Sequence, residues 1–165
     1  MKQANRAVKL IFQKELTIAS AESCTGGMIA SELVGYSGIS DNFREGYVTY
    51  SNEAKVRNLG VKPETLDAYG AVSEQTAAEM ALGVQRRANA DIGIATTGIA
   101  GPTGGTPEKP VGLVFIGCAY KGKILVRRFL FDGNRYQVRL AATRQAFSLI
   151  ADTLARSEAL RDGNP

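Results

Sequence analysis

The chain has 165 residues and no histidine, and its only cysteines are Cys24 and Cys118. The lack of histidine excludes Ser-His-Asp, Cys-His and histidine–metal mechanisms, and two cysteines are too few for a zinc site made of thiolates. Acid–base chemistry must therefore use carboxylates, lysine, tyrosine, cysteine or the chain termini. Two cysteines also form no disulfide framework, which favours a reducing cytoplasm as the location.

Long apolar runs are missing as well. No segment approaches the roughly 18 consecutive apolar residues of a membrane span, and the first residues contain no apolar run of signal-peptide length. We therefore expect neither membrane association nor export. The length and an apolar fraction of 44% predict one domain over residues 1–165, with a core over about 5–155 and a frayed tail over 156–165.

Positive charge is concentrated in one part of the chain. Residues 109–144 carry eight lysine and arginine side chains, against Asp132 as their single acidic residue. Such a local patch suits either nucleic acid or a small phosphorylated ligand. Because exposed aromatic residues are not interleaved with these charges, we rank nucleic-acid binding last.

Apolar periodicity predicts an alternation of helices and strands. Helices are expected over 2–13, 28–34, 52–59, 73–88 and 134–154, and strands over 16–20, 44–51, 91–98, 111–120 and 123–131. This order predicts an α/β fold: a single three-layer domain whose mixed, mostly parallel sheet ends in an antiparallel hairpin, with helices on both faces. Asn52 is the expected N-cap of its helix and Gly60 the expected stop.

Ligands bind such sheets at the carboxyl ends of parallel strands, which directs attention to the loops 21–27, 50–55 and 97–106. In the first loop, Ser23 follows a strand and precedes a helix whose free N–H groups suit an oxyanion. Ser23 is thus a candidate nucleophile, although Ser23 or Thr25 would equally serve as a helix cap. Cys24 is a rival nucleophile, but without histidine to raise its thiolate fraction we expect it in the core.

Lys55 lies in the first turn of the helix after the second loop. The helix dipole and burial would both lower the pKa of this lysine, which makes it a candidate base for a serine that has no histidine partner. Tyr50 would relay a proton or orient the lysine. The alternative is a solvated lysine and an ordinary tyrosine at the end of a strand.

The third loop, rich in Gly and Thr, matches neither the dinucleotide fingerprint nor the P-loop. Its N–H groups and hydroxyls would suit a phosphate, or the segment is simply an ordered surface loop. Arg135 and Arg139 lie four residues apart on one face of the last helix. They would bind phosphate in a fork, or they form an exposed basic face.

Taken together, these motifs resemble the CinA C-terminal domain family, whose stand-alone members are nicotinamide-nucleotide amidases (NMN deamidases of the PncC type). The resemblance covers about residues 5–155 and rests on AESCTGG, YSNEAKVRNLGV, GAVSEQTA, TGIAGPTGGTPEKPVG and the basic last helix. It implies hydrolysis of nicotinamide mononucleotide (NMN) to nicotinate mononucleotide and ammonia, a reaction of pyridine nucleotide recycling and NAD salvage. The longer members carry an N-terminal molybdopterin-binding-like domain with pyrophosphatase activity, which is not in this sequence.

The resemblance places the catalytic serine, tyrosine and lysine of the family on Ser23, Tyr50 and Lys55, and it implies an acyl-enzyme on the serine. The residues expected to hold the oxyanion or the substrate are Thr25, Gly26, Gly27, Thr97, Gly98, Ala100, Gly101, Arg139 and Arg135. For the phosphate of the substrate, Arg139 is preferred to Arg135.

No cofactor and no metal are expected, because histidine is absent and the acidic residues show no ligand-like spacing. The expected partner is the small-molecule substrate NMN, with no nucleic acid and no membrane, in a homodimer or larger homo-oligomer. Two other functions stay open: a non-catalytic nucleotide-binding module of the same fold, and a nucleic-acid-binding protein.

Overall fold

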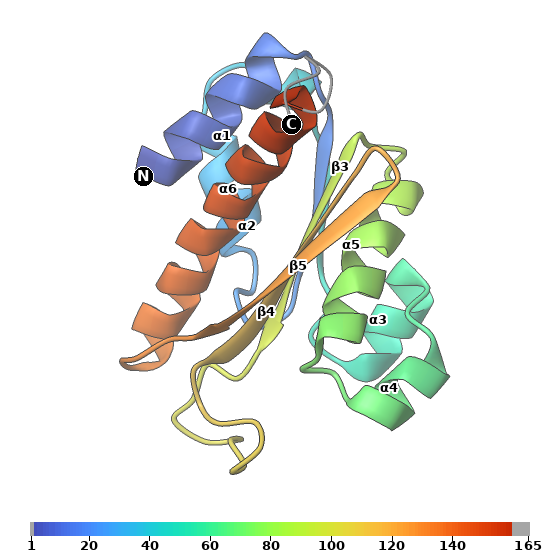
Figure 1. Ribbon diagram of the computed structural model, residues 1–165, viewed down its shortest axis with the longest axis vertical. Helices are drawn as coiled ribbons and strands as arrows, with labels where there is room; N and C mark the ends of the chain where they lie inside the picture. The colour runs from blue at the N-terminus through green and yellow to red at the C-terminus, as the bar shows by residue number, and fades with distance from the viewer. Residues whose placement is uncertain (1, 160–165) are drawn as a thin grey trace.

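A five-stranded sheet in the order β2-β1-β3-β4-β5 forms the middle layer of the molecule (Figure 1). The computed structural model describes residues 2–159. The strands are β1 (Ile18–Glu22), β2 (Phe43–Val48), β3 (Ile92–Gly98), β4 (Leu113–Tyr120) and β5 (Lys123–Leu130). β1 pairs in parallel with β2 and β3, whereas β4 is antiparallel to both β3 and β5. The predicted mixed sheet with a terminal antiparallel hairpin is confirmed.

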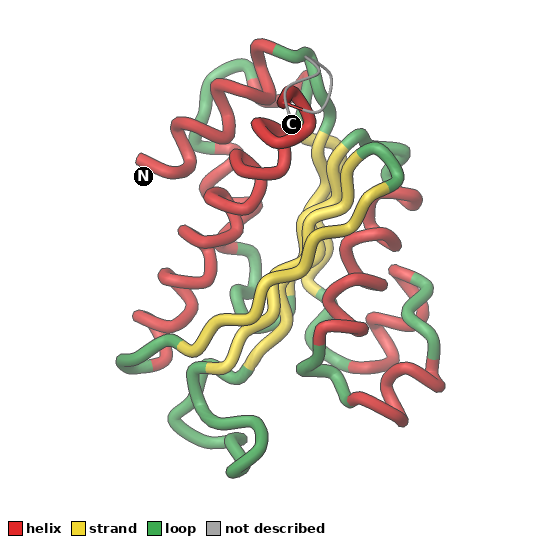
Figure 2. Tube along the Cα trace, viewed as in Figure 1, coloured by secondary structure: helices red, strands yellow, loops and turns green. Residues whose placement is uncertain are grey.

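Helices cover both faces of this sheet (Figure 1, Figure 2). One face carries α1 (Lys2–Gln13), α2 (Met28–Val34) and α6 (Arg135–Ala159), and the other carries α3 (Asn52–Leu59), α4 (Pro63–Tyr69) and α5 (Glu74–Arg87). A short 3-10 helix, η1, spans Ile39–Asp41. The larger apolar core, with Ile11, Ile94 and Phe147, lies under α1 and α6, and a smaller one, with Met80 and Val84, lies under α5.

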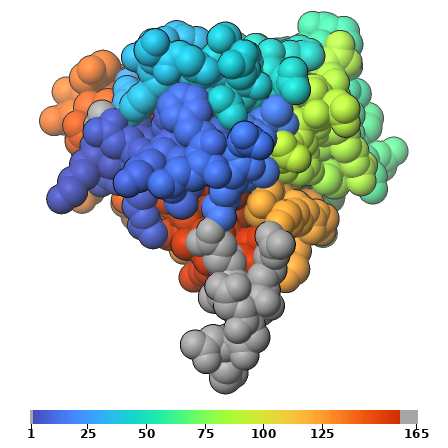
Figure 3. All heavy atoms as spheres, turned by 90° about the horizontal axis from the view of Figure 1, so that it is seen from above, coloured from blue at the N-terminus to red at the C-terminus, as the bar shows by residue number. Residues whose placement is uncertain are grey.

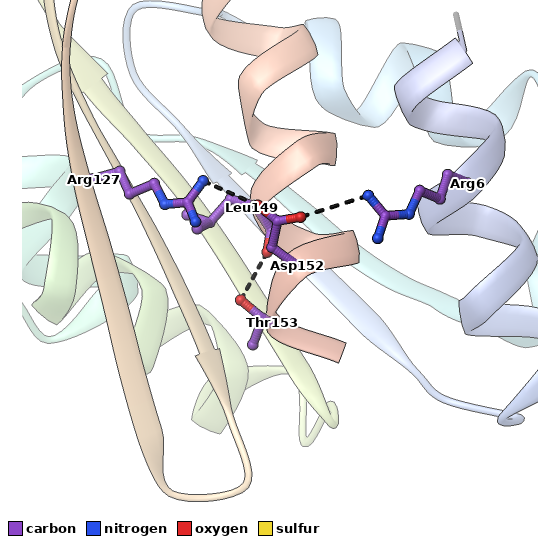
Figure 4. A network of polar contacts seen from close by, with 5 residues as sticks. All are labelled: Arg6, Arg127, Leu149, Asp152 and Thr153. Carbon is purple, nitrogen blue, oxygen red and sulfur yellow. Dashed lines mark hydrogen bonds and ion pairs between the residues drawn. The ribbon is translucent and has the colours of Figure 1, made fainter. Parts of the chain in front are cut away.

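Asp152 of α6 connects three elements at the surface (Figure 4). Its carboxylate accepts a hydrogen bond of 3.0 Å from Arg127 of β5 and forms an ion pair of 3.6 Å with Arg6 of α1. Pairs this exposed contribute only about 0–1 kcal/mol, so the apolar core, rather than this network, supplies most of the stability of the layer. Seen from above, the blue N-terminal part of the chain extends from the left of the molecule to the middle of this face (Figure 3).

Several predicted boundaries agree with the structure. The helices predicted over 2–13, 28–34 and 52–59 are α1, α2 and α3 without change, and Gly60 ends α3 in the left-handed conformation (φ 68°). The helix predicted over 73–88 is α5, and the Ser73 side chain caps it by accepting from the N–H of Thr76. The predicted hairpin turn at Lys121 and Gly122 is confirmed, with positive φ values of 50° and 72°.

Other boundaries were predicted wrongly. β1 runs over 18–22, not 16–20, because its last residues are buried although two of them, Ser20 and Glu22, are polar. The N-cap of α3 is Ser51, whose side chain accepts from the N–H of Ala54, and not Asn52. The helix α4 was not predicted. α6 continues to Ala159, so residues 156–159 are helical rather than frayed, while 160–165 lie outside the described residues.

The carboxyl ends of β1, β2 and β3 meet at one edge of the sheet, as parallel pairing requires. The long loop that follows β3 protrudes at this edge (Figure 2). The site described below lies here. Over residues 2–159, no helix has both the length and the hydropathy needed to cross a bilayer.

Candidate active site

A pocket of about 270 Å³ opens at this edge of the sheet. Its walls come from the three loops expected to converge, together with the segment before α5 and the first residue of α6. Eight predicted site residues line it, namely Ser23, Tyr50, Lys55, Thr97, Gly98, Ala100, Gly101 and Arg135, joined by Cys24, Ala71, Val72, Ile99, Thr103 and Gly104. Four other predicted residues, Thr25, Gly26, Gly27 and Arg139, are not part of the lining.

Ser23 and Lys55 meet inside the pocket, 32 residues apart in the chain. Ser23 follows β1 directly, and its N–H donates to the carbonyl of Thr96 on β3 at 3.0 Å. Lys55 sits in α3 and is 1% exposed. Its Nζ donates to Ser23 Oγ at 3.3 Å and to the Thr49 carbonyl at 2.9 Å. The amine is therefore aimed at the serine hydroxyl by a fixed backbone acceptor.

Burial sets the protonation of both potential reactive groups. It lowers the pKa of Lys55 from the ordinary 10.5, because the charged ammonium loses its hydration. The same cause raises the pKa of Cys24 to about 12, so this thiol stays protonated near neutral pH. A lysine that loses its proton more easily can act as a base, whereas a thiol that holds its proton is a poor nucleophile. Ser23 is thus the better candidate of the two.

Tyr50 and Arg135 lie at the mouth of the pocket. The Tyr50 side chain is 63% exposed, and its hydroxyl accepts a hydrogen bond of 2.8 Å from Nη2 of Arg135. Nη1 of the same arginine donates to the carbonyl of Gly101 at 2.7 Å. Arg135 thereby joins the loop after β2 to the loop after β3, with its charge beside the pocket.

Thr97 has a different role from a simple substrate ligand. The residue is buried, and its hydroxyl donates to the carbonyl of Ala71 at 2.7 Å. This bond fixes the segment that contributes Ala71 and Val72 to the pocket wall. Only the lone pairs of the Thr97 hydroxyl are left for a ligand.

The predicted oxyanion hole at the start of α2 disagrees with the hydrogen bonds found there. The N–H of Gly26 donates to the Ser23 carbonyl at 3.1 Å, and the N–H of Gly27 donates to the Glu22 carboxylate at 3.0 Å. Thr25 is fully buried, and its hydroxyl also donates to Glu22. The N–H groups of Gly26 and Gly27 are thus already used, and of the three predicted donors only the N–H of Thr25 remains for an oxyanion.

Glu22 is the residue that sequence reasoning missed. Its carboxylate accepts from the Thr25 hydroxyl at 2.6 Å and from three N–H groups at the start of α2, those of Gly27, Ile29 and Ala30, at 2.9–3.1 Å. The sequence held a signal for it: Gly27 stands at the N-cap with no side chain, so another residue had to supply the acceptor. Glu22 closes the end of α2 that was expected to face a ligand.

Arg139 was the preferred phosphate ligand, and the structure places it elsewhere. Its Nε donates to the carbonyl of Cys24 at 3.0 Å and its Nη2 to the carbonyl of Thr25 at 2.9 Å. Arg135, one helical turn earlier, is the arginine that lines the pocket. The order of preference between the two arginines is therefore reversed.

The pocket offers little to a metal ion. The acidic residue next to Ser23 is Glu22, whose oxygens already accept four hydrogen bonds. Within residues 2–159, no group of three or more His, Cys, Asp or Glu side chains is arranged to hold a metal.

Comparison with known proteins assigns a family to this arrangement. The model of the CinA C-terminal domain matches residues 1–154. Among solved structures, a competence-damaged protein (CinA) superfamily protein from Klebsiella pneumoniae is 35% identical, with a TM-score of 0.90 over 94% of this chain and 97% of that one. The competence/damage inducible protein CihA from Agrobacterium tumefaciens is 42% identical, with a TM-score of 0.88 over 93% and 94% of the two chains.

Curated relatives are more similar in sequence but much longer. A CinA-like protein from Kosmotoga olearia is 52% identical over 147 residues, which are 89% of this chain and 36% of that protein. The chain thus spans about a third of the length of the curated relatives it matches.

Proposed function

This chain belongs to the CinA C-terminal domain family, and from that premise we propose that it hydrolyses the carboxamide of NMN through an acyl-enzyme on Ser23. The observation that carries the proposal is the buried contact of 3.3 Å between Lys55 Nζ and Ser23 Oγ in a pocket. A serine next to a buried lysine is an arrangement that can activate a nucleophile in a hydrolase without histidine. The choice of NMN comes from the resemblance of the sequence motifs.

In the proposed reaction, neutral Lys55 takes the proton of the Ser23 hydroxyl while Oγ attacks the carboxamide carbon. The tetrahedral intermediate then collapses: Lys55 returns its proton to the leaving nitrogen while the C–N bond breaks. The nitrogen departs as ammonia and leaves an ester on Ser23. Lys55 next takes a proton from a water molecule, which attacks the ester. The ester bond then breaks as Lys55 passes this proton to Ser23 Oγ, which releases nicotinate mononucleotide and regenerates the Ser23 hydroxyl.

The lining of the pocket supports this substrate. Val72, Ile99 and Ala100 provide an apolar surface for the pyridine ring, next to Ser23. Arg135 provides a guanidinium at the mouth, where the phosphate would be bound in a fork. Both bonds that Arg135 makes now are to neutral oxygens, those of Gly101 and Tyr50, and a phosphate dianion is a stronger acceptor than either.

Ammonia release from NMN by the purified chain tests the proposal. We expect Ser23→Ala and Lys55→Ala each to lower kcat by at least about 10³-fold, since each removes a reacting group, with circular dichroism unchanged. A Ser23→Ala variant that kept most of the rate would make the nucleophile assignment wrong. NMN binding without ammonia release would instead identify the chain as a non-catalytic nucleotide-binding module.

Nucleic-acid binding has less support, because the basic segment uses many of its charges internally. Arg127 pairs with Asp152, Arg135 and Arg139 donate to backbone carbonyls, and Lys109 donates to the carbonyl of Tyr69. These four are half of the eight basic residues over 109–144. A DNA-binding assay with a salt titration decides this point, since a steep salt slope would indicate contacts with phosphates.

A further inference from the structure

We infer that Arg139 and Glu22 are positioning residues, which hold the turn of residues 23–27 (the Ser23 turn) from two sides and thereby fix the nucleophile relative to Lys55. The inference rests on the proposed function, because it assigns roles within the same reaction. It gives Arg139 a task other than binding the phosphate of the substrate. It also gives the buried carboxylate of Glu22 a task that the proposed mechanism leaves open.

The contacts of Arg139 and Glu22 together form a clamp on the Ser23 turn. The first side of this clamp is the guanidinium of Arg139. Nε and Nη2 form one edge of the planar group, and they donate to the successive carbonyls of Cys24 and Thr25 at 3.0 and 2.9 Å. A rigid fork of this kind fixes the spacing and the direction of both acceptors, which a single ammonium cannot do. Arg139 is anchored in α6, far from the turn in sequence, so it ties the turn to a long packed helix.

Gly26 makes room for this contact. Its φ is +58°, and a Cβ built on it would lie 3.2 Å from Nη2 of Arg139. The left-handed conformation and the close approach both favour glycine at this position. The glycine therefore serves the packing of the arginine, and not the approach of a substrate.

The second side of the clamp is Glu22. The four donors to its carboxylate are the Thr25 hydroxyl and the three N–H groups of α2 described above. The Thr25 hydroxyl lies 2.7 Å from that of Thr96, and because its own proton goes to Glu22, Thr96 must donate to it. Thr25 is thus held at its hydroxyl by Glu22 and at its carbonyl by Arg139, two residues after Ser23.

The position of Ser23 depends on these contacts for a simple reason. Ser23 lies between a strand residue, Glu22, and the two peptide units that Arg139 holds, so little backbone freedom is left to it. Displacing a reacting group by about 1 Å can cost about 100-fold in rate. The distance of 3.3 Å between Lys55 Nζ and Ser23 Oγ leaves little margin before the proton transfer fails.

Steady-state kinetics on NMN and on nicotinamide riboside, which lacks only the phosphate, test the role of Arg139. We expect Arg139→Ala to lower kcat about 10- to 100-fold on both substrates, with KM and the ratio of the two activities unchanged. Millimolar guanidinium should restore part of kcat. Arg139→Lys, which reaches one carbonyl at a time, should be intermediate, and Arg144→Ala, an exposed arginine on the same helix, should match the wild type.

Labelling of Ser23 with a fluorophosphonate gives a readout that needs no NMN. The Ser23 oxygen bonds to phosphorus, fluoride leaves, and the hydroxyl proton passes to Lys55, so the labelling rate reports how well serine and lysine are aligned. We expect labelling to slow in Arg139→Ala in parallel with kcat. If the wild type is labelled in this Arg139-dependent way but releases no ammonia from NMN, the substrate proposal fails and the positioning role stands.

Two results would overturn the inference. A higher KM for NMN with unchanged riboside kinetics would make Arg139 the phosphate ligand. A lower melting temperature with unchanged kcat and labelling rate would make it only a brace of the fold. Should Arg139→Ala fail to fold, Arg139→Lys and Arg139→Gln decide by the same measurements.

The Glu22 side is tested by Glu22→Gln, which keeps one oxygen but turns an amide NH₂ toward one of the four donors. We expect a fall in kcat of about tenfold with KM unchanged, and slower Ser23 labelling, while Glu64→Gln on the exposed face of α4 has no effect. A Glu22→Gln variant with wild-type labelling would remove Glu22 from the clamp.

Discussion

The Ser23 turn and the Gly-rich loop of residues 98–105 look alike in sequence but behave differently in the structure. Each follows a neighbouring parallel strand, and each is rich in Gly and contains one Thr. In the Ser23 turn, four carbonyls (those of Ser23, Cys24, Thr25 and Gly27), two glycine N–H groups and the Thr25 hydroxyl are bonded within the protein. In the Gly-rich loop, residues 102–105 are exposed, and Thr103 and Gly104 line the pocket.

This difference shows that glycine-rich composition does not by itself identify a ligand-binding loop. In the Ser23 turn the glycine at position 26 lets another part of the protein approach, and the result is rigidity around a nucleophile. In the Gly-rich loop the backbone of Ile99 and Gly101 is also bonded within the protein, but residues 102–105 remain exposed, which is what substrate binding needs. We therefore expect changes in the turn to act on kcat and changes around the loop to act on KM.

The largest effect is expected from Lys55→Met, which removes the amine that faces the Ser23 turn. The variant should lose at least about 10³-fold in kcat because the base is gone. It should also have a higher free energy of unfolding, because a buried amine with a lowered pKa is replaced by an apolar chain of similar length. Ammonia release and urea denaturation measure the two quantities on the same sample.

The size of the stability gain expected in Lys55→Met depends on pH. The unfolded chain keeps the Lys55 proton up to its ordinary pKa of 10.5, while the folded protein has lost it at lower pH. Stability of the wild type therefore rises with pH between the folded pKa and 10.5. The difference in the free energy of unfolding between Lys55→Met and the wild type should shrink over that pH window. A difference that grew with pH would contradict the lowered pKa of Lys55.

The pH dependence of the reaction should give the next largest effect. kcat/KM should fall about tenfold per pH unit below the pKa of Lys55 in the free enzyme, because only the neutral amine accepts a proton. Since burial lowers this pKa, the fall should begin well below pH 10.5. The fall of kcat/KM at low pH should be the same for NMN and nicotinamide riboside, because titration of the phosphate is not its cause. A different fall on the two substrates would assign the titration to the phosphate instead.

Arg135→Ala tests the open side of the site. Loss of a charge-assisted contact to phosphate, about 1.5–3 kcal/mol, should raise KM for NMN about 10- to 150-fold and leave riboside kinetics unchanged. Arg144→Ala is the matched control on the same helix. If Arg135→Ala also kept the wild-type ratio of the two activities, as the variants at 139 and 144 are expected to, the phosphate would be held elsewhere.

A pair of glycine substitutions separates the two regions most directly. Gly26 and Gly104 both have positive φ, 58° and 91°, but a Cβ at Gly26 would press on Arg139 at 3.2 Å, whereas one at Gly104 would make ordinary contact with Ile99 at 3.7 Å. We expect Gly26→Ala to lower kcat about tenfold and Gly104→Ala to change KM by no more than about threefold. Equal effects on kcat would remove the distinction between the turn and the loop.

Much of this architecture could be predicted from the sequence, and the exceptions have physical causes. Periodicity and turn residues gave the strand and helix order, and parallel pairing then forced Ser23, Lys55 and the loop after β3 to one edge. The helix α4 was missed because Thr65 is its only buried residue, so it has no apolar stripe. Glu22 was missed, and the contacts of Arg139 were not foreseen, because no local sequence pattern records them; one of these contacts spans 115 residues.

The smallest effect is expected from removal of divalent metal ions. The chain has no histidine, and the carboxylate beside the nucleophile, Glu22, is occupied by four donors that hold the Ser23 turn. The acidic residue beside the Ser23 turn, Glu22, is thus used for positioning, and Lys55 alone is left to activate the serine. We expect ammonia release from NMN to be unchanged after dialysis against EDTA, in the wild type and in Glu22→Gln at its own lower rate. If EDTA abolished the activity and a divalent ion restored it, the Ser-Lys mechanism would have to be discarded, because the activating group would then be a metal-bound water.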